Sequence, residues 1–275
     1  MTSPELPSAS TPDAAGVPFA VPGAEWHVED DFGLSLTLAI GRARQTFRWL
    51  RPGSFLMGSP ADEPQRGSAE LLHEVTLSRG FWIADTACTQ ALWMAVWPVN
   101  PSHFQDDPRN PVENVAWHDA QRFIGELNRR LSGVHARLPT EAEWEYACRA
   151  GTTTPFSFGS TVTTDEINYH GGFPYAGGAP GAYRQRPLPV RTLPANAWGL
   201  YEMHGNVWEW CEDWYADYPH EPQIDPRGPA FGKMRVLRGG TWSDPARYAR
   251  AATRSRIEPA YRPRSTGFRL VLGAP

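Results

Sequence analysis

The chain has 275 residues, of which 41% are hydrophobic and 20% are charged, and its formal net charge is −4. This balance is typical of a globular protein with a buried core, and it excludes a collagen-like, coiled-coil or wholly disordered chain. The 25 glycines and 27 prolines predict many turns between short elements, so a helix bundle is not expected. The small negative charge argues against general nucleic-acid binding, and no nucleic-acid partner is expected.

Residues 1–25 are expected to form a flexible N-terminal tail, because their five prolines, with Ser, Thr and Ala, leave too little apolar surface for folding. Residues 26–275 are then expected to form a single domain. The chain shows no basic flank followed by an apolar segment and no window of 18 apolar residues, so neither a secretion signal nor a membrane contact is expected. Three cysteines without a CxxC pair favour a reducing compartment, and we expect a cytoplasmic protein.

The first half of the chain opens with strand patterns. Residues 32–38 alternate between apolar and polar side chains, which predicts a strand, and residues 45–50 can pair with it across a turn at Gly41. Short strands are also expected at residues 55–57 and at the alternating residues 73–77. The sequence therefore predicts a hairpin followed by further short strands.

Three helices are expected next. Residues 90–97 predict a short helix, and residues 120–131 place apolar side chains on one helical stripe. Thr140 and Glu143 are spaced for a capping box that begins a third helix, and Gly151 suits its end. Beyond this point the chain becomes short apolar pieces separated by Gly, Pro and Asn. Helices and strands without βαβ alternation predict an α+β domain that is rich in loops.

Seven short segments stand out between residues 45 and 272. They are Phe55–Ser59, Pro111–Val115, Arg137–Ala147, Asn196–Met203, Gly205–Trp210, Arg238–Trp242 and Gly267–Leu270. Together, and in this order, they resemble the formylglycine-generating enzyme family, also called the sulfatase-modifying-factor domain. The resemblance implies a C-type-lectin-like fold of mixed, twisted sheets with a large fraction of loop, which agrees with the α+β prediction.

The resemblance also implies a structural calcium site in the stretch from Glu202 to Glu209. By this match, Glu202 and Glu209 would provide side-chain oxygens, and Gly205 and Val207 would provide main-chain oxygens. Carboxylate and carbonyl oxygens gathered in one short loop are the ligands that calcium prefers. The alternative is that Glu209 is a buried, hydrogen-bonded carboxylate without a metal.

Two other metal sites remain open at this stage. A second calcium site of the family lies near Asn168 and Tyr169 and expects an Asp about fourteen residues later, where this chain has Ala182. An iron site could also be assembled from residues that are distant in the sequence, because ligands that meet in space need not be neighbours in the chain. Candidate histidines for such a site are His118, His170 and His204.

The copper site of the family is missing from the sequence. Family members that oxidise a peptide cysteine hold one copper ion between two cysteines just after an Arg-Gly-Gly-Ser segment, and soft thiolates select Cu(I). Here residues 241–250 contain no cysteine, and Asp244 stands where the first thiolate would be. The three cysteines, Cys88, Cys148 and Cys211, lie elsewhere and are expected to be free and buried.

The segment from residue 235 to residue 269 carries nine arginines against two acids, a charge of +7 that leaves −11 for the rest of the chain. Arginine and aromatic residues are enriched at binding hot spots, so the segment predicts a ligand-binding surface. The alternative is that some arginines, such as Arg238, Arg254 and Arg269, are internal and paired with acids. The predicted ligand-binding residues are Trp242, Asp244, Arg247, Tyr248, Arg256, Glu258, Tyr261 and Arg264.

These observations predict a recognition module that binds a protein or peptide through this C-terminal segment, without turnover. The resemblance adds that such a module could be of the retroelement-diversified type. The alternative is a metal-dependent oxidoreductase of the same superfamily that uses non-heme iron. Oxidation of a sulfatase cysteine to formylglycine is the least favoured function, because both copper cysteines are missing.

Overall fold

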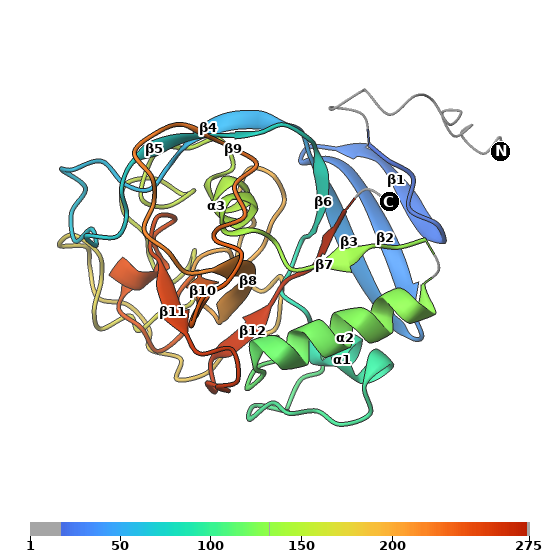
Figure 1. Ribbon diagram of the computed structural model, residues 1–275. Coiled ribbons are helices and arrows are strands. Elements are labelled where there is room, and N and C mark those ends of the chain that lie inside the picture. The colour runs from blue at the N-terminus through green and yellow to red at the C-terminus, as the bar shows by residue number, and fades with distance from the viewer. Residues whose placement is uncertain (1–17, 132, 274–275) are drawn as a thin grey trace.

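The computed structural model describes residues 18–131 and 133–273, and its largest part is a six-stranded sheet (Figure 1). In spatial order its strands are β1 (Ala24–Asp30), β2 (Gly33–Ile40), β3 (Ala43–Leu50), β6 (Phe81–Ala84), β13 (Val271–Leu272) and β7 (Ala136–Arg137). The C-terminal strand β13 is inserted between β6 and β7, so the two ends of the domain belong to one sheet.

Two smaller sheets form the other part of the molecule. One contains β11 (Ser255–Ile257), β10 (Arg235–Arg238), β8 (Trp208–Trp214) and β12 (Thr266–Phe268). The other contains β4 (Gly53–Met57), β5 (His73–Leu77) and β9 (Gln223–Ile224). Both sheets mix parallel and antiparallel pairs, since β12 runs parallel to β8 and β9 runs parallel to β5.

The predicted hairpin and helices are confirmed. Strands β2 and β3 pair with Ile40 opposite Ala43. The helices are α1 (Gln90–Val96), α2 (Trp117–Arg130) and α3 (Glu141–Arg149), and a 3-10 turn, η1 (Ala246–Ala249), is the only helical element after α3 among the described residues. The capping box of α3 is formed, since Thr140 Oγ1 accepts a hydrogen bond from the Glu143 amide at 3.1 Å and the Glu143 carboxylate accepts one from the Thr140 amide at 2.8 Å.

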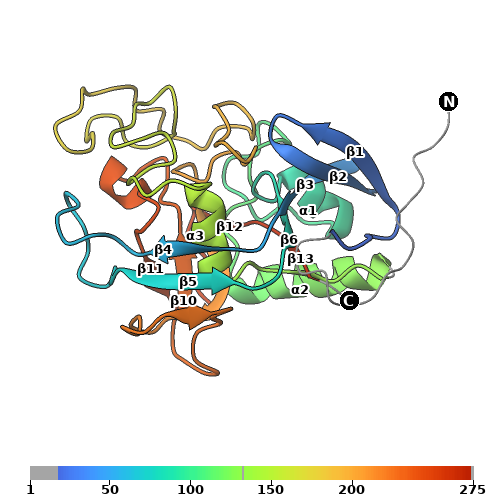
Figure 2. The same cartoon turned by 90° about the horizontal axis from the view of Figure 1, so that it is seen from above.

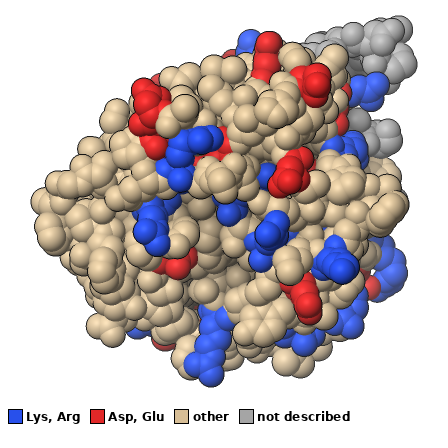
Figure 3. Space-filling view, turned by 60° about the vertical axis from the view of Figure 1, so that its left-hand side comes forward, with Lys and Arg blue, Asp and Glu red and all other residues tan. Residues whose placement is uncertain are grey.

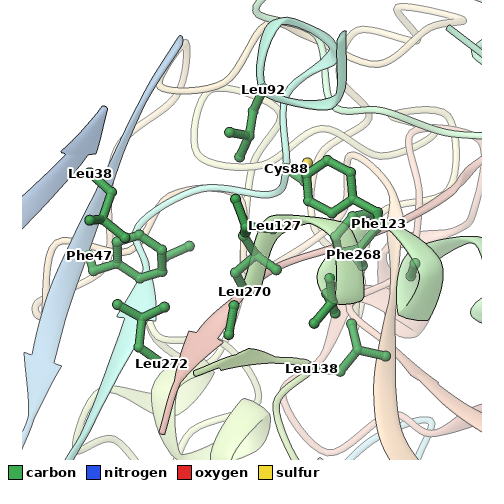
Figure 4. Packing of buried hydrophobic residues seen from close by; sticks show 14 of the residues in the cluster. Leu38, Phe47, Cys88, Leu92, Phe123, Leu127, Leu138, Phe268, Leu270 and Leu272 are labelled. Carbon is green, nitrogen blue, oxygen red and sulfur yellow. The ribbon is translucent and has the colours of Figure 1, made fainter. Parts of the chain in front are cut away.

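The main core lies between the six-stranded sheet and the helices α1 and α2 (Figure 4). Leu38 and Phe47 of the hairpin belong to the same buried cluster as Phe123 and Leu127 of α2, and each of the four is at most 2% exposed. Burying side chains of this size contributes roughly 1.5–3 kcal/mol each. The apolar stripe that the sequence predicts for α2 is therefore its core-facing side.

The N-terminal boundary is corrected by the structure. We expected a flexible tail up to residue 25, but residues 18–25 pack on the domain. Val21 is 5% exposed within the main core, and the Phe19 carbonyl accepts a hydrogen bond from Trp82 Nε1 at 3.2 Å. The remainder of the expected tail, residues 1–17, lies outside the described residues.

A long loop region separates α3 from β8 in the chain and forms the group of yellow-green loops at the upper left of Figure 2. It contains no helix or strand from residue 150 to residue 207, and isolated bridges such as Asn168 to Gly205 fix its path. The α+β, loop-rich fold expected from the sequence is thus confirmed. None of the helices in the described part of the chain is long and apolar enough to cross a membrane.

Candidate functional site

The loop that follows β10 begins the candidate site. Gly239 and Gly240 have φ values of 100° and 76°, and a Cβ on Gly240 would lie 2.9 Å from the Tyr248 carbonyl oxygen, so only glycine fits this turn. The turn carries the chain alongside the long loop region. There the Asp244 carbonyl accepts a hydrogen bond from the His170 amide at 2.9 Å.

Five aromatic side chains from three separate loops meet at this point, and we call them the aromatic row: Phe104, Trp242, Tyr183, His170 and Phe173. Trp242 lies between Phe104, at a ring distance of 5.7 Å, and Tyr183, at 6.2 Å. Tyr183 stacks on His170 at 3.7 Å, and His170 contacts Phe173 at 4.6 Å. Phe173 is 55% exposed and Tyr183 is 37% exposed, so the row presents ring surface to solvent.

Polar groups accompany the aromatic row. The indole Nε1 of Trp242 is buried and has no hydrogen-bond partner among the described residues. Arg186 lies 5.7 Å above the Phe104 ring and forms an ion pair with Asp106. Burial raises the pKa of the Asp244 carboxyl, although hydrogen bonds from neighbouring side chains oppose this shift. The row therefore combines apolar area with a few groups that can orient a ligand.

This loop does not fit the copper ion of the family. Its polar side chains are oxygen donors that hydrogen-bond one another, with Thr241 Oγ1 lying 2.9 Å from Ser243 Oγ and 3.1 Å from Asp244 Oδ2. Hydroxyl and carboxylate oxygens are poor ligands for Cu(I), which selects thiolates. All three cysteines are free and buried, as expected, and belong to the two large core clusters.

The other predicted ligand-binding residues lie around the C-terminal segment in different surroundings. Arg247 and Tyr248 are exposed on η1, where the Arg247 guanidinium donates to the Tyr248 hydroxyl at 2.8 Å. Arg256 lies on β11, and its guanidinium is 4.3 Å from the Tyr215 ring. Figure 3 shows charged side chains of both signs scattered over the side of the molecule that it displays.

Three predicted residues lie in the loop between β11 and β12, and all three are exposed: Glu258, Tyr261 and Arg264. The Glu258 carbonyl accepts a hydrogen bond from the Tyr261 amide at 3.1 Å, which makes a turn. Arg264 is close enough to Glu113 for its positive charge to oppose the rise that burial causes in the pKa of Glu113. Because Glu113 also accepts a hydrogen bond from the Phe104 amide at 2.9 Å, Arg264 lies near one end of the aromatic row.

Sequence reasoning placed Trp242 in the binding site, and of the other four members of the aromatic row it named only His170, as a candidate iron ligand. Phe104 comes from the loop before α2, and His170, Phe173 and Tyr183 come from the long loop region. These loops have no periodic pattern from which a shared surface could be predicted. The heavy aromatic content of the chain was the only indication in the sequence that some rings line a surface.

Several arginines of the C-terminal segment are internal. Arg250 is 2% exposed and forms ion pairs with Glu63 at 2.5 Å and with Glu70 at 2.7 Å. Arg254 holds both carboxylate oxygens of Glu141, at 2.7 and 2.8 Å. These pairs link the C-terminal segment to acids that are more than a hundred residues away in the chain.

Two more internal arginines lie in the motif segments. Arg238 is fully buried and pairs with Glu145 of α3. Arg269 is also fully buried, and its guanidinium contacts both oxygens of Glu209 at 2.8 and 2.9 Å. The interpretation of Arg238, Arg254 and Arg269 as internal residues is therefore confirmed.

The two acids predicted to bind calcium differ in their surroundings. Glu209 accepts hydrogen bonds from Arg269 and, at 2.7 Å, from Trp144 Nε1, so its charge is already paired. Glu202 lies near the main-chain amides of residues 191–193, but neither of its buried oxygens has a hydrogen bond of normal geometry to a described residue. Burial raises the pKa of Glu202 to about 8.

A calcium ion at this motif would therefore depend on Glu202 and on main-chain oxygens. No three or more His, Cys, Asp or Glu side chains converge as a possible metal site within the described ranges. Gly205 has a φ of 77°, and a Cβ there would lie 2.2 Å from the Asn168 carbonyl oxygen, so the motif needs glycine to form its turn. The main-chain path is thus strongly constrained at this point.

His204, one of the candidate iron ligands, is occupied by protein contacts. Its Nδ1 donates to the Ala249 carbonyl at 2.6 Å, and its Nε2 accepts from the Ser157 amide at 3.1 Å. Burial lowers the pKa of His204 to about 4, so the ring is neutral at physiological pH. The Cys148 thiol lies 3.6 Å from Nε2, and burial raises its pKa. This cluster is a neutral, hydrogen-bonded part of the core.

Comparisons with known proteins agree with the motifs and the fold. Residues 41–274 match the family described as the Sulfatase-modifying factor enzyme 1-like domain. The formylglycine-generating enzyme of Streptomyces coelicolor is 33% identical over 229 residues, which are 77% of this chain and 70% of that protein.

Two solved structures have the same fold over most of their length. Treponema denticola variable protein 1 has a TM-score of 0.75 and 29% identity, over 86% of this chain and 98% of that one. PvdO from Pseudomonas aeruginosa has a TM-score of 0.73 and 27% identity, over 86% of this chain and 97% of that one. The chain therefore belongs to the formylglycine-generating enzyme family of sulfatase-modifying-factor domains.

Proposed function

We propose that this chain is a recognition module that binds a protein or peptide at the aromatic row, without turnover. The observation that carries the proposal is the surface beside Trp242, where five partly stacked rings have exposed area. The adjacent loop has hydroxyl and carboxylate side chains and no thiol. Rigid aromatic side chains supply contact area at a low cost in conformational entropy, as they do in antibody binding loops.

The charged residues around the row support a peptide or protein ligand. Arg186 lies at the Phe104 end, Arg264 lies near Glu113, and Arg247 is exposed on η1. Arginine binds carboxylates through two hydrogen bonds and also stacks on rings, so these groups suit acidic or aromatic side chains of a partner. The two structural relatives are called a variable protein and PvdO, and neither name describes formylglycine formation.

The proposal includes a structural calcium ion and a reducing location. Calcium would be held by Glu202 with the main-chain oxygens of Gly205 and Val207, while Glu209 remains paired with Arg269. Its role there would be to neutralise a buried carboxylate and to stabilise the turn. Three free, buried cysteines support a protein that acts in a reducing compartment such as the cytoplasm.

Selection from a random peptide library displayed on phage tests the binding role. We expect peptides that bind the wild-type chain and that lose at least about tenfold in affinity with Trp242→Ala or Tyr183→Ala, the size expected for a hot-spot residue. Phe231→Ala is the matched control, because Phe231 is an aromatic residue that is 84% exposed and lies outside the row. Peptides that bind wild-type and Trp242→Ala equally well would contradict the proposed site.

A further inference from the structure

A cavity elsewhere in the molecule shares no residue with the aromatic row. It has a volume of about 330 Å³ and lies between β5 and β9, the first turn of α3 and the chain that follows β8. Cavities that bind small molecules have volumes of roughly 300–1,000 Å³. The cavity opens to solvent beside the exposed residues Asp217, Pro219 and Arg227.

Two acids at the closed end of the cavity have different partners. Glu141 is held by the guanidinium of Arg254 through two hydrogen bonds. Asp213 is 5% exposed, and its Oδ2 accepts one hydrogen bond, from the Glu141 amide at 2.8 Å. No arginine, lysine or histidine within the described ranges forms an ion pair with Asp213, and its Oδ1 has no hydrogen bond there. Asp213 is thus a buried carboxyl with one oxygen available in a cavity wall.

The remaining walls are largely apolar and aromatic. Trp214 and Tyr218 follow Asp213 in the chain, and His73 lies 4.7 Å from the Tyr218 ring. The His73 ring donates from Nδ1 to the Leu71 carbonyl at 3.0 Å, and in the neutral ring Nε2 is an acceptor. The Arg254 guanidinium already lies 3.6 Å from the Tyr218 ring centre, and that of Arg235 lies 3.6 Å from the Trp214 ring centre, so these rings contribute apolar wall area. The acceptors in the cavity match a group that carries several N–H donors.

We propose that this cavity binds a small organic cation of the amidinium, guanidinium or primary ammonium class. The N–H groups of the cation would donate to Asp213, and its carbon skeleton would lie against Tyr218 and Trp214. The opening of the cavity should not select ligands by their charge, because Asp217 and Arg227 carry opposite charges there. Specificity for a cation therefore comes from the closed end.

The protonation of Asp213 gives the binding a pH dependence. Burial, together with the negative charges of nearby acids, raises the pKa of Asp213 to about 8. The charged and titratable groups that lie around Asp213 and its cavity are Glu141, Glu143, Glu212, Arg137, Arg235, His73, Arg254, Cys211, Tyr218, Asp217 and Arg227. Because a cation binds the ionised carboxylate, the affinity should rise about tenfold per pH unit up to about pH 8 and then level off.

Benzamidine, benzamide and benzoate are suitable probes, since they have similar shapes and carry positive, zero and negative charge. Calorimetry on the full chain should show binding of benzamidine, with benzamide and benzoate at least about tenfold weaker. Asp213→Asn keeps an acceptor for the Glu141 amide but cannot ionise, and it should weaken benzamidine binding by about the same factor. The exposed Asp217→Asn variant is the matched control and should stay within about twofold.

Three results would overturn the proposal: no benzamidine binding at millimolar concentration, equal affinity for benzamide, or an unchanged affinity in Asp213→Asn. If that variant does not fold, the wild-type pH profile decides, because a flat profile between about pH 6 and pH 8 would also contradict a role for Asp213. Trp242→Ala should leave benzamidine binding unchanged. A loss in that variant would mean that the probe binds the aromatic row and would also contradict the proposal.

Discussion

Eight of the nine arginines between residues 235 and 269 fall into an inner set and an outer set, and Arg235 is half-buried against Trp117 and Trp214. The inner set is fully or almost fully buried and paired with acids: Arg238, Arg250, Arg254 and Arg269. The outer set is exposed at the surface: Arg247, Arg256, Arg262 and Arg264. Residues of the same type, in the same segment, thus form buried ion pairs in one place and lie at the surface in another.

The difference lies in the surroundings and not in the spacing along the chain. A buried guanidinium has lost its water and depends on its carboxylate partner, so removal of either partner leaves an uncompensated charge. An exposed pair such as Arg262 with Asp119 remains hydrated, and its attraction is small. The same substitution should therefore cost much more stability in the inner set than in the outer set.

The largest effect is expected for Arg250→Ala. This change leaves Glu63 and Glu70 buried without their cation, and it should lower the free energy of unfolding by about 3–5 kcal/mol. Arg262→Ala is the matched control and should cost less than about 1 kcal/mol. Urea unfolding followed by tryptophan fluorescence measures both values. Equal losses in the two variants would remove the distinction between the sets.

Calcium should have the next largest effect, because Glu202 is a buried acid that no arginine of the inner set pairs with directly. Calcium at a hundredfold excess over Kd should add about 2.7 kcal/mol to the free energy of unfolding. The unfolded chain ionises Glu202 near its ordinary pKa of 4.5, whereas the folded chain does so at about 8. Without calcium, this group therefore lowers stability as pH rises between these values.

The calcium effect should grow over the same pH range, since the ion binds the carboxylate form. Melting curves with calcium and with EDTA, at several pH values, measure both trends. Glu202→Gln should remove the calcium effect and flatten the contribution of this group to the pH dependence. If EDTA has no effect on the wild-type melting temperature, calcium does not bind this motif.

Truncation of the N-terminal segment should have a smaller effect on stability, and it tests where the folded core begins. Deletion of residues 1–25 removes Val21 from the core and shortens β1, and it should cost about 2 kcal/mol, comparable to the loss of one buried aliphatic side chain. Deletion of residues 1–17 is the control that isolates the contribution of residues 18–25. Equal melting temperatures for the two truncated chains would show that residues 18–25 contribute no stability.

The smallest effect on stability is expected in the outer set. Arg247→Ala and Tyr248→Ala should each change the free energy of unfolding by no more than about 0.5 kcal/mol, because both side chains are exposed. They should nevertheless weaken binding of peptides selected on the wild-type chain. Thermal unfolding and peptide titration, carried out on the same samples, separate the two effects. If these variants unfolded as readily as Arg250→Ala, the side chains on η1 would stabilise the fold, and their proposed role in binding alone would be contradicted.

Local patterns predicted much of the fold. The hairpin follows from the alternation around Gly41, and α3 follows from the capping box of Thr140 and Glu143, since both depend on neighbours within a few residues. The N-terminal boundary was placed too late because proline-rich composition hides the single buried residue Val21. Composition describes an average, whereas packing can depend on one side chain.

The candidate site was harder to predict than the fold. Trp242 could be placed in a loop from the family motif, but its neighbours Phe104 and Tyr183 come from distant segments without periodicity and meet it only through ring contacts in the folded chain. Arg250 was not recognised as internal, because its partners Glu63 and Glu70 are about 180 residues away in the sequence. Such contacts are properties of the folded chain.

The central claim, that this family member binds without oxidising, has a direct test. The purified chain is mixed with an equimolar amount of Cu(I), a cysteine-containing peptide and oxygen, and both oxygen uptake and peptide mass are followed. Because residues 241–250 offer no thiolate, we expect oxygen uptake no faster than that of the copper salt alone and no conversion of the peptide thiol to an aldehyde. Catalytic oxygen uptake with formylglycine in the peptide would contradict the account.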